Sequence, residues 1–136
     1  MKSRVVTIVA YLFFVTTVAF ASDCTTISKE TPNSKKWNEV KQFIAIHYES
    51  KTIDIRQITD KDSWYIVEFE SRDFEPVISV LKETSSGLTV KSDWGGMPVD
   101  GDSIKDYLAE KTKGVPPDLL WCFSPKGPPF ARIKQL

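Results

Sequence analysis

The spacing of hydrophobic residues changes partway along this chain, and that change limits the possible folds more than any other feature. Between residues 34 and 50 the apolar side chains recur at helical spacing, while lysines and a glutamate occupy the other positions. This stripe consists of Trp37, Val40, Ile44 and Tyr48, widened by Phe43. From residue 53 onward the period falls to two, which is typical of β-strands. A helix followed by strands predicts the α+β class.

Four segments alternate in this way, and turn-forming clusters separate them. The strands are expected near residues 53–56, 65–70, 76–83 and 88–94, with turns at 60–63, 72–76 and 85–87. Short connections favour antiparallel neighbours. A second helix should follow near the C-terminus, where Ile104, Tyr107 and Leu108 are spaced helically, with Ser103 and Asp106 as its capping box. Pro116 and Pro117 then open a short turn over residues 118–123, which should bring Leu119, Leu120 and Trp121 onto the body of the domain. The sequence therefore predicts an N-terminal helix packed on a four-stranded antiparallel sheet, then a second helix.

The first 21 residues have the pattern of a secretory signal peptide. Lys2 and Arg4 precede an uncharged, mostly apolar run that ends at the small-residue motif Ala19-Phe20-Ala21. A membrane anchor is the alternative, but the run is shorter than the roughly 20 apolar residues that a spanning helix needs. Cleavage after Ala21 is the prediction, and it implies a periplasmic or secreted protein with no membrane attachment afterwards.

The remaining chain is expected to form one domain over residues 22–123, followed by a proline-rich tail over residues 124–136. Its two cysteines, Cys24 and Cys122, would reach an oxidising compartment, so we expect one disulfide between them. Without the two basic residues of the leader, 16 Lys and Arg remain of 18, against 18 Asp and Glu, a formal charge near −2. Such a balance gives no electrostatic reason to expect a nucleic-acid partner.

Catalytic candidates are few, and each has a structural alternative. His47 is the only histidine, which argues against a zinc site, and we expect it at a helix edge rather than as a base. Glu68 and Glu70 fall on one strand face, where they could form a glycosidase pair, although a solvated sheet face is the favoured interpretation. Two Asp-x-Asp turns lack the ligands of a calcium loop. No metal and no cofactor are predicted.

One segment stands out as a candidate protein-binding site. It consists of Trp94, Gly95, Gly96, Met97, Pro98 and Val99. Glycines let the backbone approach a partner closely, and Trp and Met are enriched at contact surfaces. The alternative is a bulge that turns the chain, with Trp94 filling the core.

The element order and the disulfide pattern resemble known families. A helix, four antiparallel strands and a helix tied back by a disulfide are similar to the cystatin-like and NTF2-like plan of a helix lying across a curved sheet. The stretch Pro116-Pro117-Asp118-Leu119-Leu120-Trp121-Cys122-Phe123 resembles one in small secreted bacterial proteins, in which an N-terminal cysteine pairs with one after a Pro-x-x-Leu stretch. The Gln-x-Val-x-Gly loop of true cystatins is absent, so inhibition of cysteine proteases is not implied.

These observations lead to one functional hypothesis and two alternatives. The hypothesis is a non-enzymatic periplasmic protein-binding module, an inhibitor or immunity-type protein directed against a secreted or lytic enzyme. One alternative is a small-ligand-binding protein or weak hydrolase that uses His47 with Glu68 or Glu70, in a pocket lined by Trp94. The other is a structural or stress protein of the cell envelope.

Overall fold

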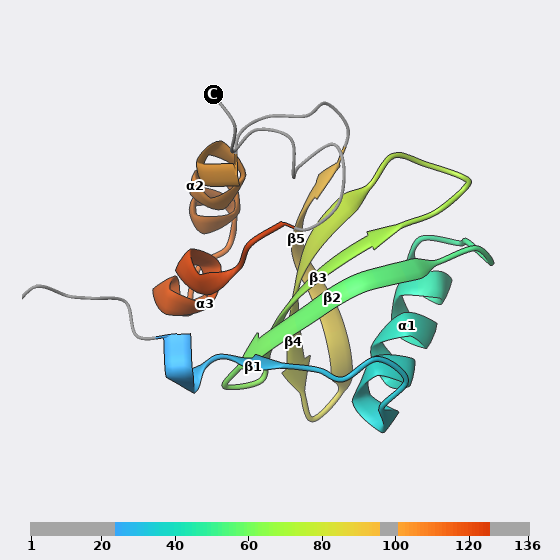
Figure 1. Cartoon of the computed structure of the whole chain (residues 1–136), viewed down its shortest axis with the longest axis horizontal. Coiled ribbons are helices and arrows are strands. Elements are labelled where there is room, and N and C mark those ends of the chain that lie inside the picture. Colours follow the sequence, from blue (N-terminus) through green and yellow to red (C-terminus); the bar gives the residue numbers. More distant parts are fainter. Residues whose placement is uncertain (1–23, 96–100, 126–136) are drawn as a thin grey trace, which may run out of the picture.

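The computed structural model describes residues 24–95 and 101–125 (Figure 1). Its elements, in chain order, are a 3-10 helix η1 (Cys24–Thr26), β1 (Ser28–Lys29), α1 (Lys35–His47), β2 (Asp54–Lys61), β3 (Trp64–Glu70), β4 (Val77–Thr84), β5 (Gly87–Gly95), α2 (Gly101–Lys111) and α3 (Pro117–Cys122). The five strands form one antiparallel sheet in the order β1-β2-β3-β4-β5. The α+β class is therefore confirmed, whereas the predicted count of four strands is too low by one.

The strand and the helix that were not predicted are both short. β1 has two residues and pairs with β2 through Ser28 opposite Asp60 and Lys29 opposite Thr59. Two residues cannot display an alternating pattern, so the polar lead-in gave no strand signal. α3 was expected to be a turn, but Pro117 occupies its first position, where proline's fixed φ angle and missing N–H suit a helix.

α1, which carries the predicted hydrophobic stripe, begins directly after its capping residue Ser34. It ends at His47, earlier than the expected end near residue 50. The side chain of Ser34 accepts a hydrogen bond of 3.2 Å from the backbone N–H of Trp37. The last helical residue is His47, and Glu49 has a φ of 51°, a left-handed conformation that stops the helix. In the second helix, Ser103 lies inside α2 and not at its cap, because α2 already begins at Gly101.

Two bulges decide which side chains face which way. In β2 the pairing register shifts between Ile55 and Gln57, and in β4–β5 it shifts between Val80 and Leu81, opposite Ser92 and Val90. An extra residue in one strand moves all following side chains to the other face. Simple alternation along the sequence therefore does not predict which face of the sheet each side chain of β2 or β5 occupies.

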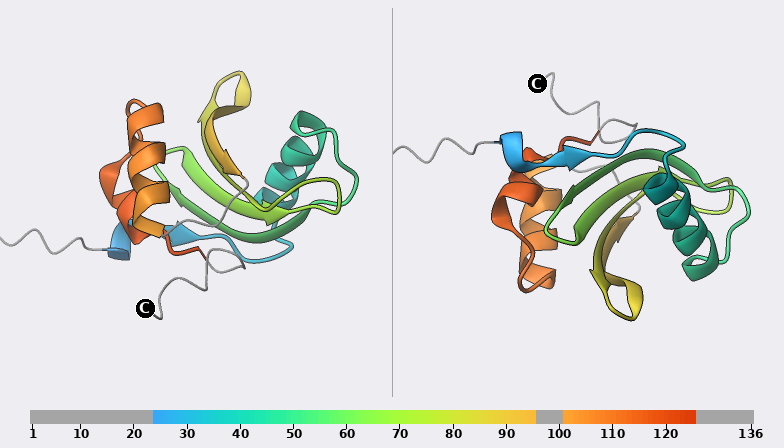
Figure 2. Two further views of the ribbon diagram at one scale, coloured as in Figure 1. Left: turned by 90° about the horizontal axis from the view of Figure 1, so that it is seen from above. Right: turned by 90° about the horizontal axis from the view of Figure 1, so that it is seen from below.

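Helices cover both faces of the sheet (Figure 2). α1 packs on one face and contributes to a first core cluster, which contains Trp37, Val40, Ile44, Ile53, Ile55, Ile58, Tyr65, Val67, Phe69, Val77 and Leu81. α2 and α3 pack on the other face around a second cluster, which contains Trp64, Ile66, Ile78, Val80, Ile104, Leu108, Val115, Leu119, Leu120 and Phe123. The curved sheet therefore lies between two layers of helix.

The second layer overturns one expectation about β3. Glu68 belongs to the set of β3 residues that faces α2 and α3, and its side chain is 0% exposed. The prediction of a solvated face is wrong for Glu68. Trp64 and Ile66 lie in the same alternating set, so the sequence did carry an apolar signal for that face.

The predicted disulfide is present. Cys24 and Cys122 are bonded, with their Cα atoms 5.7 Å apart and a sequence separation of 98. The bond joins η1 to α3, and an ion pair between Lys61 and Asp118 joins α3 to β2. The N-terminal and C-terminal segments of the domain are thus held on the same side of the sheet.

Candidate functional site

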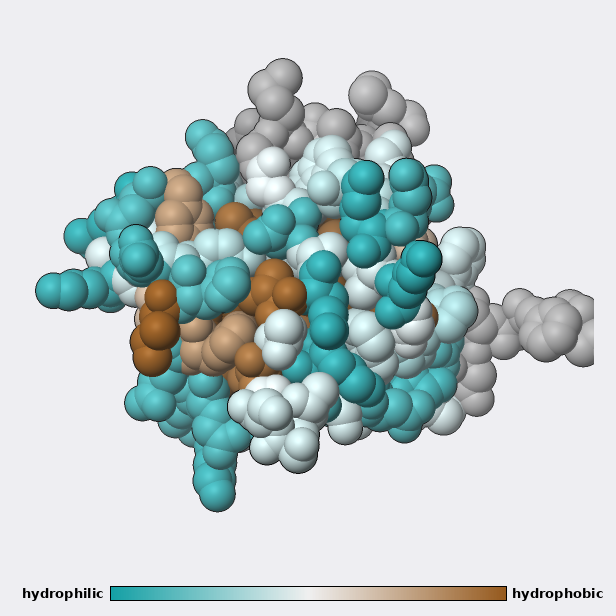
Figure 3. Space-filling model, turned by 180° about the vertical axis from the view of Figure 1, so that it is seen from behind, coloured by the Kyte–Doolittle hydropathy of each residue, from teal (hydrophilic) through white to brown (hydrophobic). Residues whose placement is uncertain are grey.

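Partly buried hydrophobic side chains border the first core cluster, and this border is the strongest candidate for a contact surface. Among the described residues, α1 is the one helix that contributes to this cluster. Ile46 projects away from the core with 79% of its surface exposed. We define the α1–β5 face as Phe43, Ile46, His47, Phe74, Leu88 and Val90. From behind, hydrophobic side chains gather on the side of the molecule that carries α1 (Figure 3).

Aromatic rings in contact connect this face to the core. Phe43 stacks on His47 with ring centroids 5.7 Å apart, and His47 meets Tyr48 edge-on at 4.8 Å. Tyr48 in turn contacts Phe69 at 5.1 Å and Phe74 at 5.9 Å. Ring pairs in these geometries restrict one another's motion. His47 is therefore part of an aromatic series, and within the described chain no carboxylate lies within hydrogen-bonding distance of it.

Tyr48 fixes the position of α1 relative to β5. Its hydroxyl donates a hydrogen bond of 2.8 Å to Asp93 Oδ2 and lies 2.5 Å from Ser79 Oγ. Burial, chiefly, raises the pKa of the Tyr48 hydroxyl far above its ordinary value, so the group stays protonated and remains a donor. These bonds tie the end of α1 to both β4 and β5, which sets the width of the α1–β5 face.

The segment singled out in the sequence lies partly outside the described residues. Trp94 sits on β5 with its ring 4.9 Å from that of Tyr107, against the second cluster, and Gly95 ends β5 opposite Val77. The indole Nε1 of Trp94 is buried and has no hydrogen-bond partner in the part of the chain that the structure describes. The other members, Gly96, Met97, Pro98 and Val99, fall outside that part.

The bulge at Lys91 explains where Trp94 lies. Leu88 and Val90 pack against the first cluster, whereas Trp94 packs against the second. Uninterrupted alternation would place all three on one face. Trp94 therefore points away from the α1–β5 face.

The residues of the hydrolase alternative are divided between the two faces of the sheet. His47 belongs to α1, on one face, and Glu68 lies under α2 and α3, on the other. Gln57 Nε2 donates to Glu68 Oε2 at 3.0 Å and to the carbonyl oxygen of Ser124 at 2.6 Å. Glu70 shares the face of Glu68, as predicted, and forms an ion pair with Arg56. The structure does not bring His47 near Glu68.

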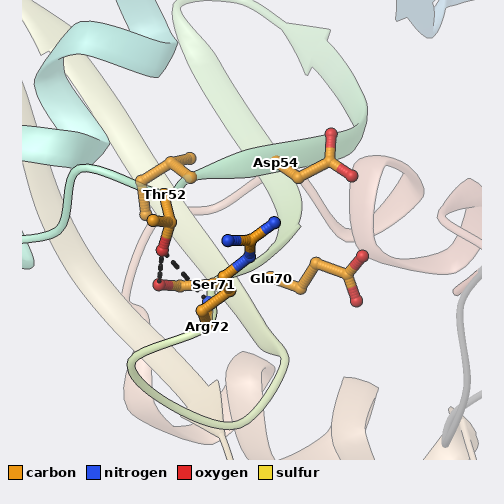
Figure 4. Close-up of a pocket in the computed structure, with 6 residues that line it drawn as sticks. Thr52, Asp54, Glu70, Ser71 and Arg72 are labelled. Atoms are coloured by element: carbon orange, nitrogen blue, oxygen red, sulfur yellow. Dashed lines mark hydrogen bonds between the residues drawn. The ribbon is translucent and has the colours of Figure 1, made fainter.

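Glu70 also lines a cavity at the end of the β2–β3 ladder (Figure 4). The cavity has a volume of about 640 Å³ and is bordered by residues from the start of β2 and the end of β3. The lining residues are Thr52, Ile53, Asp54, Glu70, Ser71 and Arg72. This size lies within the range of roughly 300 to 1,000 Å³ that small-molecule sites occupy.

A second exposed hydrophobic residue is Trp121, on α3. The sequence predicts that it packs on the body, and this is wrong: 65% of its surface is exposed. Its neighbours Leu119 and Leu120 are buried, as expected. Lys105 donates to the Trp121 carbonyl oxygen at 2.9 Å, and its ammonium lies 5.8 Å from the centre of the indole.

Sequence reasoning missed the α1–β5 face, although one signal was available. Ile46 falls outside the helical stripe, on the side of α1 that also carries Lys35 and Gln42. An isoleucine on the polar side of an amphipathic helix marks an exposed apolar position. Leu88 and Val90 gave no such signal, because only the bulge decides which face they occupy.

Within residues 24–95 and 101–125, no three His, Cys, Asp or Glu side chains are grouped so as to hold a metal ion. No helix in that part of the chain has the length and apolar character needed to cross a membrane. The resemblance to the cystatin-like and NTF2-like plan stays a prediction. Comparisons of the chain with protein-family models, with curated proteins and with solved structures find no match.

Proposed function

We propose that this protein is a non-enzymatic protein-binding module that contacts its partner through the α1–β5 face. The observation that carries the proposal is the exposure of Ile46 on α1, the helix whose Phe43 also borders the first core cluster as a partly buried side chain. Clustered exposed apolar side chains on a small domain mark interaction surfaces. The class of partner proposed is a secreted or lytic enzyme, which the module would inhibit or against which it would give immunity.

The surroundings of the face favour binding without rearrangement. Tyr48 ties α1 to β5 through Asp93, and aromatic contacts lead inward from Phe43 to the core. A surface held rigid before contact loses little conformational entropy when it binds. Aromatic side chains add large contact area with few rotatable bonds.

Side-chain contact is a better description of the binding mode than addition of a strand to β5. β5 is the outer strand of the sheet and is nine residues long, so its edge is a possible template for pairing. However, the register shift places the exposed cation Lys91 in the middle of that edge. Bulges and lysines on an edge strand discourage pairing with another chain.

A comparison of three baits tests the proposal. The tagged protein, its Ile46→Asp variant and its Trp121→Ala variant are used to capture partners from periplasmic extract and culture supernatant. Bound proteins are then identified by mass spectrometry. Trp121 is the matched control, since it is also an exposed hydrophobic residue but lies under the opposite face, on α3.

The proposal predicts one dominant partner that Ile46→Asp loses and Trp121→Ala retains. Purified partner should then bind the wild-type protein, and its enzymatic activity should fall on binding. Loss of the partner with Trp121→Ala but not with Ile46→Asp would reject the α1–β5 face. Capture of no partner by any bait would reject the protein-binding function itself.

A further inference from the structure

Two carboxylates face each other at the cavity beside β2 and β3. Asp54 and Glu70 are direct partners in the antiparallel ladder. Side chains at such positions have Cβ atoms roughly 4.5 to 5.5 Å apart, and like charges there destabilise a sheet. Arg56, the bulged residue of β2, forms an ion pair with Glu70 and offsets one of the two charges. The charge of Asp54 is not offset, because within the described chain its carboxylate has no hydrogen bond and no ion pair.

One positively charged side chain that lines the cavity, Arg72, has a guanidinium group without a partner among the described residues. The backbone N–H of Arg72 donates to Thr52 Oγ1 at 3.1 Å, whereas its guanidinium bonds to no described residue. In Figure 4 the Arg72 side chain extends from its loop toward the side of the cavity where the carboxylates of Asp54 and Glu70 lie. The carboxylates of Asp54 and Glu70 thus give one wall of the cavity a negative charge. The guanidinium group of Arg72, beside them, offers several N–H hydrogen-bond donors in a planar arrangement.

A network of hydroxyl groups holds the loop that carries Arg72. The buried Ser50 donates to Asp73 Oδ2 at 2.6 Å and lies 2.7 Å from Ser71 Oγ. The hydrogen bond from Ser50 is the main cause that lowers the pKa of the Asp73 carboxyl below its ordinary value. Thr52 Oγ1 lies 2.8 Å from Ser71 Oγ, which joins the loop before β2 to the loop after β3. The loop that carries Arg72 is therefore fixed to the segment that leads into β2, the strand that Asp54 begins.

From this arrangement we infer that the cavity binds a small zwitterion, such as an amino acid or a short peptide. The ligand's ammonium group lies between the carboxylates of Asp54 and Glu70, and its carboxylate group is held by the Arg72 guanidinium. Arg56 and Arg72 balance Asp54 and Glu70, so the site as a whole is neutral and matches a ligand of zero net charge. The inference does not depend on the α1–β5 face, because no residue that lines the cavity belongs to that face.

Three small probes that carry different charged groups test the inference on the purified protein. Glycylglycine carries an ammonium and a carboxylate, glycinamide has only the ammonium, and N-acetylglycine has only the carboxylate. Each is titrated against isotope-labelled protein, and the amide shifts of residues 52–54 and 70–72 are followed by NMR. Glycylglycine should saturate these shifts and bind at least about tenfold more tightly than either single-charge probe, since each charged pair contributes about 1.5 kcal/mol or more.

Two conservative variants assign the ends of the ligand. Asp54→Asn should weaken glycylglycine and glycinamide at least about tenfold and leave N-acetylglycine unchanged. Arg72→Gln should weaken glycylglycine and N-acetylglycine and leave glycinamide unchanged. Lys51→Gln, which removes a nearby exposed charge outside the cavity, serves as the control and should change none of the affinities.

Several results would overturn the inference. They are the absence of saturable shifts with glycylglycine, equal affinities for the three probes, and unchanged glycylglycine binding in both cavity variants. The comparison of probes on the wild-type protein needs no variant, so it stands even if a substitution lowers stability. Failure here would leave the partner captured through Ile46 unaffected, because the two sites share no residue.

Discussion

The hydroxyl of Tyr48 donates a hydrogen bond of 2.8 Å to Asp93, and this bond joins the end of the first helix to the outer strand of the sheet. The same hydroxyl lies 2.5 Å from Ser79, whose side chain is fully buried in β4. One phenol group thus joins the end of α1 to two neighbouring strands, β4 and β5. Lys36, near the start of α1, adds an ion pair with Glu83 of β4.

Replacing Tyr48 with phenylalanine should therefore loosen this corner of the domain. The aromatic contacts with Phe69 and Phe74 would remain, but buried Ser79 would lose its partner. We expect the free energy of unfolding to fall by about 1 to 3 kcal/mol, the cost of an unsatisfied buried hydroxyl. Urea unfolding measures this loss, and hydrogen exchange should speed up, relative to the wild type, more for β5 amides than for β3 amides. An equal increase in the two strands would contradict the role given to Tyr48.

Removing the disulfide should lower stability sharply. Cys24 and Cys122 close a long loop, since their sequence separation is 98. Replacing both with serine frees the unfolded chain, and the chain-entropy relation gives a loss of about 4 to 5 kcal/mol. Thermal and urea unfolding of the double variant beside the oxidised wild-type protein provide the measurement. A melting temperature equal to that of the wild type would show that the bond does not stabilise the domain.

Two tryptophans should respond differently to alanine substitution. Trp94 packs on Tyr107 and the second core cluster, so Trp94→Ala should cost about 2 to 3 kcal/mol. Trp121 is largely exposed, so Trp121→Ala should change the free energy of unfolding by about 0.5 kcal/mol or less. Unfolding curves for the pair give the comparison. If Trp94→Ala left stability unchanged but removed the captured partner, Trp94 would belong to the binding surface, as the sequence first suggested.

Acid should weaken the attachment between α1 and β4. Glu83 accepts hydrogen bonds from Tyr65 at 2.6 Å and from Lys36 at 3.0 Å, and these bonds lower the pKa of its carboxyl below the ordinary 4.5. A carboxyl with a lowered folded-state pKa stabilises the fold above pH 4.5, and this contribution disappears as the pH falls through the lowered value. The free energy of unfolding of wild-type protein should thus fall below pH 4.5 more steeply than that of Glu83→Gln.

Urea unfolding of both proteins between about pH 3 and pH 7 separates this effect from general acid destabilisation. Asp118→Asn provides a comparison, because the ion pair with Lys61 also lowers the pKa of Asp118 but lies on α3. Identical pH profiles for wild type and Glu83→Gln would show that Glu83 adds nothing to the pH dependence.

The sequence predicted the long elements well because their hydrophobic periodicity is strong. The stripe of Trp37, Val40 and Ile44 identified α1, and Ser34 identified its first turn. Four alternating runs corresponded to β2 through β5, and the two cysteines, expected to reach an oxidising compartment, predicted their own bond. The helix and strand patterns are local in the sequence, and two cysteines allow only one intramolecular disulfide.

The candidate site was less predictable because it depends on side-chain direction. Arg56 and Lys91 are ordinary charged residues in the sequence, and only strand pairing shows that each accompanies a shift of register. That shift decides whether Val90 and Trp94 face the same helix. Burial of Glu68 likewise required knowing that α2 and α3 return to cover the second face.

By itself, then, the sequence determined the α+β class, the positions of the main helix and four strands, and the disulfide, because periodicity and chemistry act over short distances or between unique partners. Only the tertiary structure decided the fifth strand, the two-sided covering of the sheet, the exposed border beside Ile46, and the meeting of Asp54, Glu70 and Arg72 at one cavity. Those features arise from contacts between segments far apart in the chain, where a one-residue shift in pairing reverses which side of the sheet a side chain occupies.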